Sequence, residues 1–139
     1  MVDKSLISKK LGRIEDYLNQ IRRKKDPGIK AFLKDKDLQS IVLFNLIQAI
    51  QACVDISAHI ISDSGWGTPT TQAEIFEILA ENTVIQKSLC RKMVQMAGFR
   101  NRIVHEYEKT DFKIVHTIWK KHLADISKFC KAVILKYNL

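Results

Sequence analysis

The sequence has little of what marks a membrane, secreted or metal-binding protein. Its 139 residues include only three cysteines, two prolines and five glycines. Six polar side chains interrupt the most apolar stretch, residues 41–61, so no run of about eighteen apolar residues exists and we expect no membrane span. The first residues lack the apolar core and small-residue cleavage site of a secretory signal. We therefore expect a cytoplasmic protein.

The cysteines and histidines are too few and too scattered to build a metal cage. Cys53, Cys90 and Cys130 are odd in number and form no C-x-x-C pair, and each falls within an apolar helical pattern. They are predicted to be buried free thiols, as suits a reducing compartment. No H-x-x-x-H spacing or acidic cluster occurs, so we expect neither a bound metal nor another cofactor.

Apolar residues recur at three- and four-residue spacing along most of the chain, and no alternating pattern indicates a strand. The pattern predicts an all-α protein, an antiparallel bundle of about five helices forming a single domain over residues 1–139. Two long helices are expected at residues 4–25 and 37–62, a short helix after Thr71, a fourth that ends near Gly98, and a last from about 110 to 137.

The expected helix boundaries rest on a few short signals. Thr71 with Glu74 forms a capping box, and Thr83 with Gln86 repeats the pattern. Gly98 is a candidate for a left-handed helix end.

Charge is distributed unevenly along the chain. Lysine and arginine outnumber aspartate and glutamate by eleven to five in residues 1–36 and by twelve to four in residues 87–139, whereas residues 37–86 hold six acids and no basic residue. Such a division favours separate basic and acidic surfaces, of which the basic one attracts polyanions such as nucleic acid. Charge alone leaves open that the basic residues serve only solubility.

The segment between the last two predicted helices is crowded with polar and ionisable groups. On a regular helix Arg100 and Tyr107 share one face and Arg102 and His105 another, whereas a break at the turn brings Arg100 to His105. An imidazole that titrates near neutral pH can move a proton, and a guanidinium can hold two phosphate oxygens, so the pair suits phosphodiester chemistry. The alternative is structural, because such side chains also cap carbonyl groups at helix junctions.

Residues 96–107, Met-Ala-Gly-Phe-Arg-Asn-Arg-Ile-Val-His-Glu-Tyr, resemble the signature of the HepT family, the HEPN-domain toxins of prokaryotic toxin–antitoxin pairs. The core of that signature is an arginine, four residues, a histidine, one residue and a tyrosine. Similar segments extend over nearly the whole chain: Arg13-Ile14-Glu15, Val54-Asp55-Ile56, His59-Ile60-Ile61-Ser62 and Phe76-Glu77-Ile78-Leu79. The sequence departs from the family at Asn82-Thr83, where a glycine-containing turn is expected, and at Trp66-Gly67.

The resemblance implies a metal-independent RNA endonuclease of a type VII toxin–antitoxin system, acting as a homodimer whose active site is shared between the subunits. It further implies a nucleotidyltransferase antitoxin of the MNT type, which inactivates the toxin by attaching AMP to a tyrosine. Carried over to this sequence, Arg100 and His105 are catalytic, Asn101 and Arg102 support them, and Tyr107 is modified. The alternative function is a HEPN-like module that binds RNA or nucleotides, and associates with a nucleotidyltransferase, without cleaving RNA.

Polar residues also line one side of the predicted helix 37–62. Asp55 and His59 belong to this stripe and are candidates to face the active-site cleft, with Asp55 orienting an imidazole. The competing interpretation is an internal network in which the polar groups satisfy one another.

Overall fold

The computed structural model describes residues 1–139 and confirms an all-helical protein. It has seven α-helices and one 3₁₀ turn, more than the five or so expected. They are α1 (Lys4–Arg22), α2 (Ile29–Phe32), α3 (Lys36–Ser64), α4 (Gln72–Glu81), α5 (Lys87–His105), η1 (Tyr107–Lys109), α6 (Phe112–Lys121) and α7 (Leu123–Tyr137).

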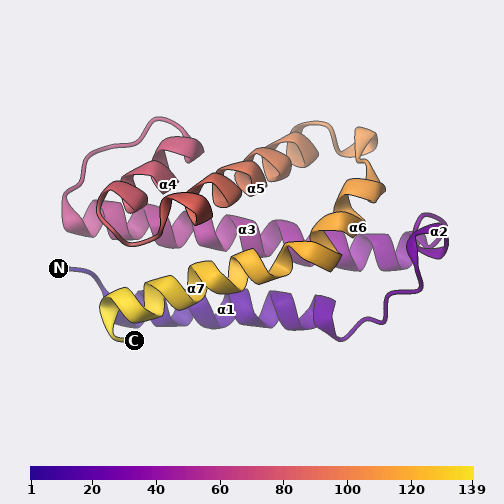
Figure 1. Ribbon diagram of the computed structural model, residues 1–139, viewed down its shortest axis with the longest axis horizontal. Coiled ribbons are helices and arrows are strands. Elements are labelled where there is room, and N and C mark those ends of the chain that lie inside the picture. Colours follow the sequence, from indigo (N-terminus) through magenta and orange to yellow (C-terminus); the bar gives the residue numbers. More distant parts are fainter.

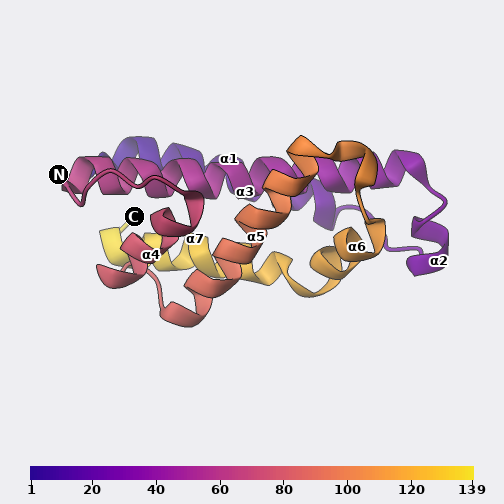
Figure 2. The ribbon, with the colours of Figure 1, turned by 90° about the horizontal axis from the view of Figure 1, so that it is seen from above.

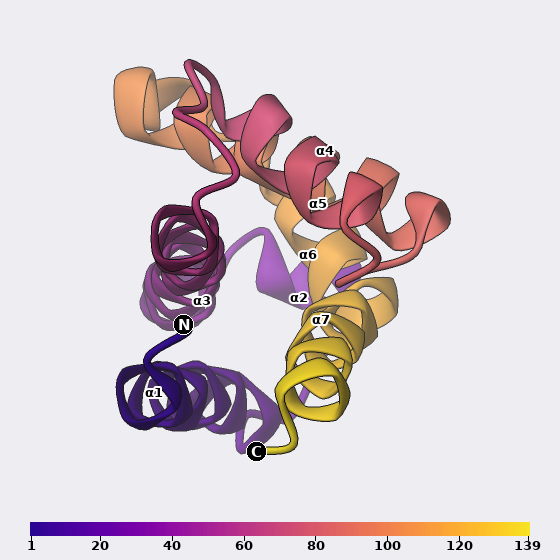
Figure 3. The same cartoon turned by 90° about the vertical axis from the view of Figure 1, so that its left-hand side faces the viewer.

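The long helices run antiparallel to their neighbours around one interior. Helix α3 contacts α1, α4, α5, α6 and α7, and it runs opposite to both α1 and α5 (Figure 1). Seen from above, α5 crosses the other long helices obliquely (Figure 2). The end view shows α1, α3, α5 and α7 arranged around a shared centre, which 35 buried apolar residues fill as one continuous core (Figure 3).

Several predicted helix boundaries are confirmed. Helix α1 ends just before Asp26-Pro27-Gly28, and Gly28 has a φ of 94°, which favours glycine. Thr71 caps α4 by accepting a hydrogen bond from the backbone N–H of Glu74 at 3.1 Å. Asp111 caps α6 in the same manner.

Two other boundary predictions are wrong. Thr83 does not open α5: the helix begins after Gln86, which makes no side-chain cap, and Thr83 instead has a left-handed backbone with a φ of 60°. The final helix is not continuous, because it is interrupted at His122, which separates α6 from α7. Apolar residues keep a helical period across this break, so periodicity could not reveal it.

The longest helix is also the most central. Helix α3 is the one helix long and apolar enough to cross a membrane by length and composition, although no long uninterrupted apolar run occurs in it. Its most apolar window is 56% buried against the other helices, which accounts for this composition in a core helix.

The cysteines are confirmed as buried free thiols. Burial, reinforced by the nearby Glu15 carboxylate, raises the pKa of Cys130 to about 12, and burial also raises the pKa of Cys53 and Cys90. Protonated thiols of this kind are weak nucleophiles, so the cysteines serve packing.

Candidate functional site

The candidate motif lies at the C-terminal end of one unbroken helix. Helix α5 continues through Gly98 to His105, so the prediction that it ends near Gly98 is wrong. Gly98 does not have a positive φ, and a side chain placed there would meet the Arg102 guanidinium at 3.8 Å. Arg102, one turn further on, therefore folds back along the helix over Gly98.

The continuous helix decides between the two geometries considered for the motif. Five residues of α-helix place Arg100 and His105 about 140° apart around the axis and about 7.5 Å apart along it. Arg102 and His105, three residues apart, lie on neighbouring positions of one face. The helix ends at His105, so Tyr107 belongs to the 3₁₀ turn and does not share a helical face with Arg100. Within one chain, no break in the helix brings Arg100 to His105.

The basic side chains of the motif have no acidic partners. Arg100 is half-buried; its Nη1 donates a hydrogen bond to Oδ1 of Asn101 at 3.2 Å, and its buried Nε has no partner. No carboxylate lies within ion-pair distance of Arg100, Arg102 or His105. A guanidinium with an unused donor is costly to bury unless an anion completes its hydrogen bonds. The motif is therefore electrostatically suited to a phosphate group.

The end of the motif is open to solvent. His105 is exposed, and Tyr107 is 55% exposed with a phenol group that makes no hydrogen bond within the chain. The backbone carbonyl of Tyr107 accepts a hydrogen bond from the Thr110 hydroxyl, which helps to hold the turn. Both the imidazole and the phenol can thus be reached by a second molecule.

Asp55 and His59 form no hydrogen bond or ion pair with this motif within the chain. The Asp55 carboxylate accepts a hydrogen bond from Nε2 of Gln51 at 2.9 Å and faces α1, where it lines a small pocket of about 170 Å³ with Lys10 and Arg13. His59 is half-buried and makes no hydrogen bond. Neither side chain is paired with Arg100 or His105.

A large groove, which we call the lysine groove, lies elsewhere, between α5 and α7, and no sequence pattern revealed it. It has a volume of about 880 Å³ and is lined by five lysines, Lys87, Lys92, Lys128, Lys131 and Lys136. The basic composition of residues 87–139 was visible in the sequence, but the pairing of α5 with α7 was not. No group of three or more His, Cys, Asp or Glu side chains is arranged to hold a metal ion.

Comparison with known proteins places this geometry in context. The family model described as "Ribonuclease HepT-like" matches residues 9–133. The chain is 30% identical over 128 residues to the mRNA nuclease HepT of Shewanella oneidensis, covering 92% of this chain and 96% of the relative. It is 29% identical over 111 residues to the tRNA nuclease HepT of Aphanizomenon flos-aquae, covering 79% of this chain and 75% of that one.

Among solved structures, the chain is similar to the tri-AMPylated Shewanella oneidensis HEPN toxin, determined in complex with its MNT antitoxin. The TM-score is 0.85 at 31% identity, and the match covers 96% of this chain and 98% of the toxin chain. The likeness therefore extends over the whole bundle and includes the segment that carries the candidate motif.

Proposed function

Since the chain belongs to the HepT-like ribonuclease family, we propose that it is an endoribonuclease, the toxin of a toxin–antitoxin pair, with Arg100 and His105 as its catalytic residues. The observation that carries this proposal is the unpaired cationic cluster at the exposed end of α5. It combines a buried, unsatisfied guanidinium nitrogen with a solvent-accessible imidazole. The three buried thiols suit action in the reducing cytoplasm.

The proposed reaction is an intramolecular transesterification that needs no metal. An imidazole of His105 accepts the proton of the RNA 2′-hydroxyl, whose oxygen then attacks the adjacent phosphorus. The bond from phosphorus to the 5′-oxygen breaks, and that oxygen takes a proton from an imidazolium. The products are a 2′,3′-cyclic phosphate and a free 5′-hydroxyl. The Arg100 guanidinium binds the non-bridging oxygens as negative charge grows on them, and Asn101 and Arg102 support it.

This chemistry favours a homodimer. One imidazole cannot be proton acceptor and donor in the same step, and each chain offers one histidine at the motif. The helix also directs Arg100 and His105 to different sides, so a second chain related by two-fold symmetry is the simplest source of the missing groups. Exposed apolar side chains beside the motif, Val104 at 51% and Ile114 at 47%, suit a subunit contact.

The proposed partner is a nucleotidyltransferase antitoxin that attaches AMP to Tyr107. The phenol is exposed and free of hydrogen bonds, so its oxygen is available to attack the α-phosphate of ATP and release pyrophosphate. The attached phosphodiester would add negative charge two residues from His105 and occupy the space that the substrate phosphate needs. The toxin would then be inhibited by charge neutralisation and by occlusion together.

The decisive experiment incubates the purified protein with RNA in the presence of a chelator, next to the His105→Ala variant. We expect the parent to cleave and His105→Ala to lose about 10²–10⁴-fold in rate while keeping its helical content, because general acid–base catalysis is typically worth that much. Uncut RNA retained by the parent protein would favour the binding-module alternative. Equal cleavage by parent and variant would overturn the assignment of His105.

A second experiment tests Tyr107. We expect Tyr107→Phe to remain toxic in cells but to escape an enzymatically active antitoxin, because the ring is retained and only the acceptor oxygen is lost. The measurements are growth during co-expression and the mass of the purified toxin, which should lack added AMP. Neutralisation of Tyr107→Phe as efficient as that of the parent would contradict this role.

A further inference from the structure

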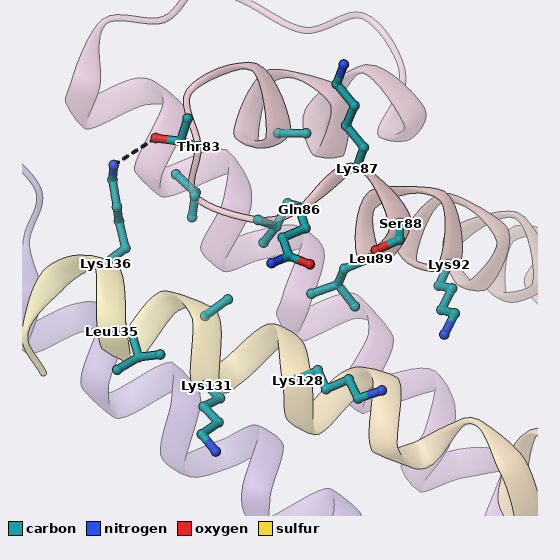
Figure 4. Close-up of a pocket in the computed structure, with 14 residues that line it drawn as sticks. Thr83, Gln86, Lys87, Ser88, Leu89, Lys92, Lys128, Lys131, Leu135 and Lys136 are labelled. Carbon is teal, nitrogen blue, oxygen red and sulfur yellow. Dashed lines mark hydrogen bonds between the residues drawn. The ribbon is translucent and has the colours of Figure 1, made fainter.

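The lysine groove has an unusual concentration of positive charge. Its fourteen lining residues include five lysines and no aspartate or glutamate. Lys92 pairs with Asp125 at 3.4 Å, and Lys136 donates a hydrogen bond to the Thr83 hydroxyl at 3.1 Å. Lys87, Lys128 and Lys131 have no ion-pair partner. In Figure 4, Lys92 from α5 and Lys128 from α7 extend toward the same end of the groove.

Besides the lysines, six apolar residues and the polar residues Thr83, Gln86 and Ser88 line the groove, and none of its lining side chains is aromatic. Leu89 and Ala132 line it, and Leu135 is 70% exposed. Nucleobases bind such a surface weakly, because base recognition on single strands relies on aromatic stacking. The chemistry therefore favours a ligand recognised by its phosphate groups, independently of sequence.

Lining residues shared between neighbouring grooves link the lysine groove to Arg102 of the candidate motif. Lys92 also lines a second groove of about 360 Å³ together with Phe99 and Arg102. Phe99 and Arg102 in turn line a third groove of about 150 Å³ with Glu106, next to His105. The three grooves follow one another along α5 from Lys92 to Arg102, about 15 Å along the helix axis, and we call this series of grooves the trough. Asp125 in the second groove and Glu106 in the third add carboxylates to its lining, and His105 lies about 140° around the helix from Lys92.

We propose that this trough binds the sugar–phosphate backbone of a single-stranded RNA substrate, with Lys87, Lys92, Lys128 and Lys131 anchoring the strand away from the cleavage site. The inference rests on the proposed ribonuclease function, since the strand enters at the motif. Phosphate contacts to lysine are sequence-independent and add affinity rather than cleavage chemistry. The trough thus explains how a small chain holds a long RNA without selecting its bases.

The test replaces two groove lysines in protein that binds RNA but does not cut it. Lys128→Gln/Lys131→Gln is combined with His105→Ala, and the affinity for an unstructured RNA of about thirty nucleotides is measured against salt concentration. We expect the double variant to bind this RNA about tenfold more weakly at low salt. The slope of log binding constant against log salt concentration should be shallower by about 1.4, because each lost phosphate contact on a single strand reduces that slope by about 0.7. The affinity for a tetranucleotide should fall less, because a strand of that length is too short to reach from the motif to the lysines.

The matched control carries Lys4→Gln/Lys9→Gln on α1 in the same His105→Ala protein. Both lysines are exposed, and the net charge changes equally. Equal affinities and slopes for the groove and control variants would overturn the proposal. So would a groove variant that binds RNA as the parent does but loses an acidic partner protein. Because binding is measured without cleavage, failure here is distinct from failure of the ribonuclease proposal, which the chelator assay detects.

Discussion

Thr83 is the residue whose backbone fits its side chain least well. Only Thr83 and Asn138 among the non-glycine residues have a positive φ, and asparagine tolerates this conformation far better than a β-branched residue does. The turn is held by the N–H of Val84, which donates to the carbonyl of Leu79 at 2.9 Å after α4 ends. The glycine expected here from the family resemblance thus has a physical basis.

We predict that Thr83→Gly stabilises the protein by about 1 kcal/mol, because relief of the left-handed strain exceeds the added entropy of the unfolded chain. Urea denaturation measures the free energy of unfolding. Thr83→Ala, which keeps a Cβ atom in the same conformation, is the control and should gain less. A loss of stability in Thr83→Gly would show that the Lys136 contact to the Thr83 hydroxyl outweighs the strain.

At the scale of helices and turns, two largely buried acidic side chains link neighbouring elements. The Asp125 side chain is only 5% exposed and pairs with Lys92 of α5 and, at 3.0 Å, with Nδ1 of His122 at the break. This network couples the α6–α7 break to α5 and satisfies a buried carboxylate. Asp26 has a similar role in the loop after α1, since it pairs with His116 at 3.0 Å and Lys120 at 3.3 Å on α6.

The ion pairs of Asp26 should make stability sensitive to acid. Burial acts to raise the pKa of this carboxyl, but hydrogen bonds from the Gly28 N–H, His116 and Lys120 outweigh it and lower the pKa. A lowered pKa in the folded state means that the ionised carboxylate stabilises the fold above the unfolded-state value of 3.8, and that this contribution is lost as the pH falls through the folded-state pKa.

We therefore expect Asp26→Asn to cost about 1–2 kcal/mol at neutral pH and to differ less from the parent at pH values below the folded-state pKa of Asp26. Urea denaturation across this pH range measures the difference. The control is Asp16→Asn on α1, an exposed carboxylate without an ion-pair partner, which should change stability little at any pH. If Asp26→Asn lowered the free energy of unfolding by the same amount at every pH, the loop would be held by packing and not by the charge of Asp26.

For the molecule as a whole, the basic and acidic segments of the chain lie on different helices of the fold. The acidic segment forms α3 and α4, while basic residues come from α1, α5 and α7. Because α5 packs against α7, lysines 36 to 49 positions apart in sequence line one groove. The same packing leaves the motif at the exposed end of α5, so the proposed substrate trough and the proposed cleavage site share one helix.

The sequence by itself determined the helical class, most helix boundaries and the motif from Arg100 to Tyr107, because these depend on short-range periodicity, capping and residue spacing. It misplaced the end of α5 at Gly98, because the sequence does not distinguish a glycine inside a helix from one that ends a helix with a left-handed backbone. It also missed the break at His122, where Asp125 pairs with the His122 imidazole and with Lys92 of α5.

Only the tertiary structure decided which side chains from distant segments come together. It placed Asp55 toward α1 instead of the motif, and it joined the lysines of α5 and α7 into one groove. It also separated Arg100 from His105 on one rigid helix, and that separation is the reason to expect a second chain at the site. Such arrangements depend on long-range packing, which no local pattern of residues encodes.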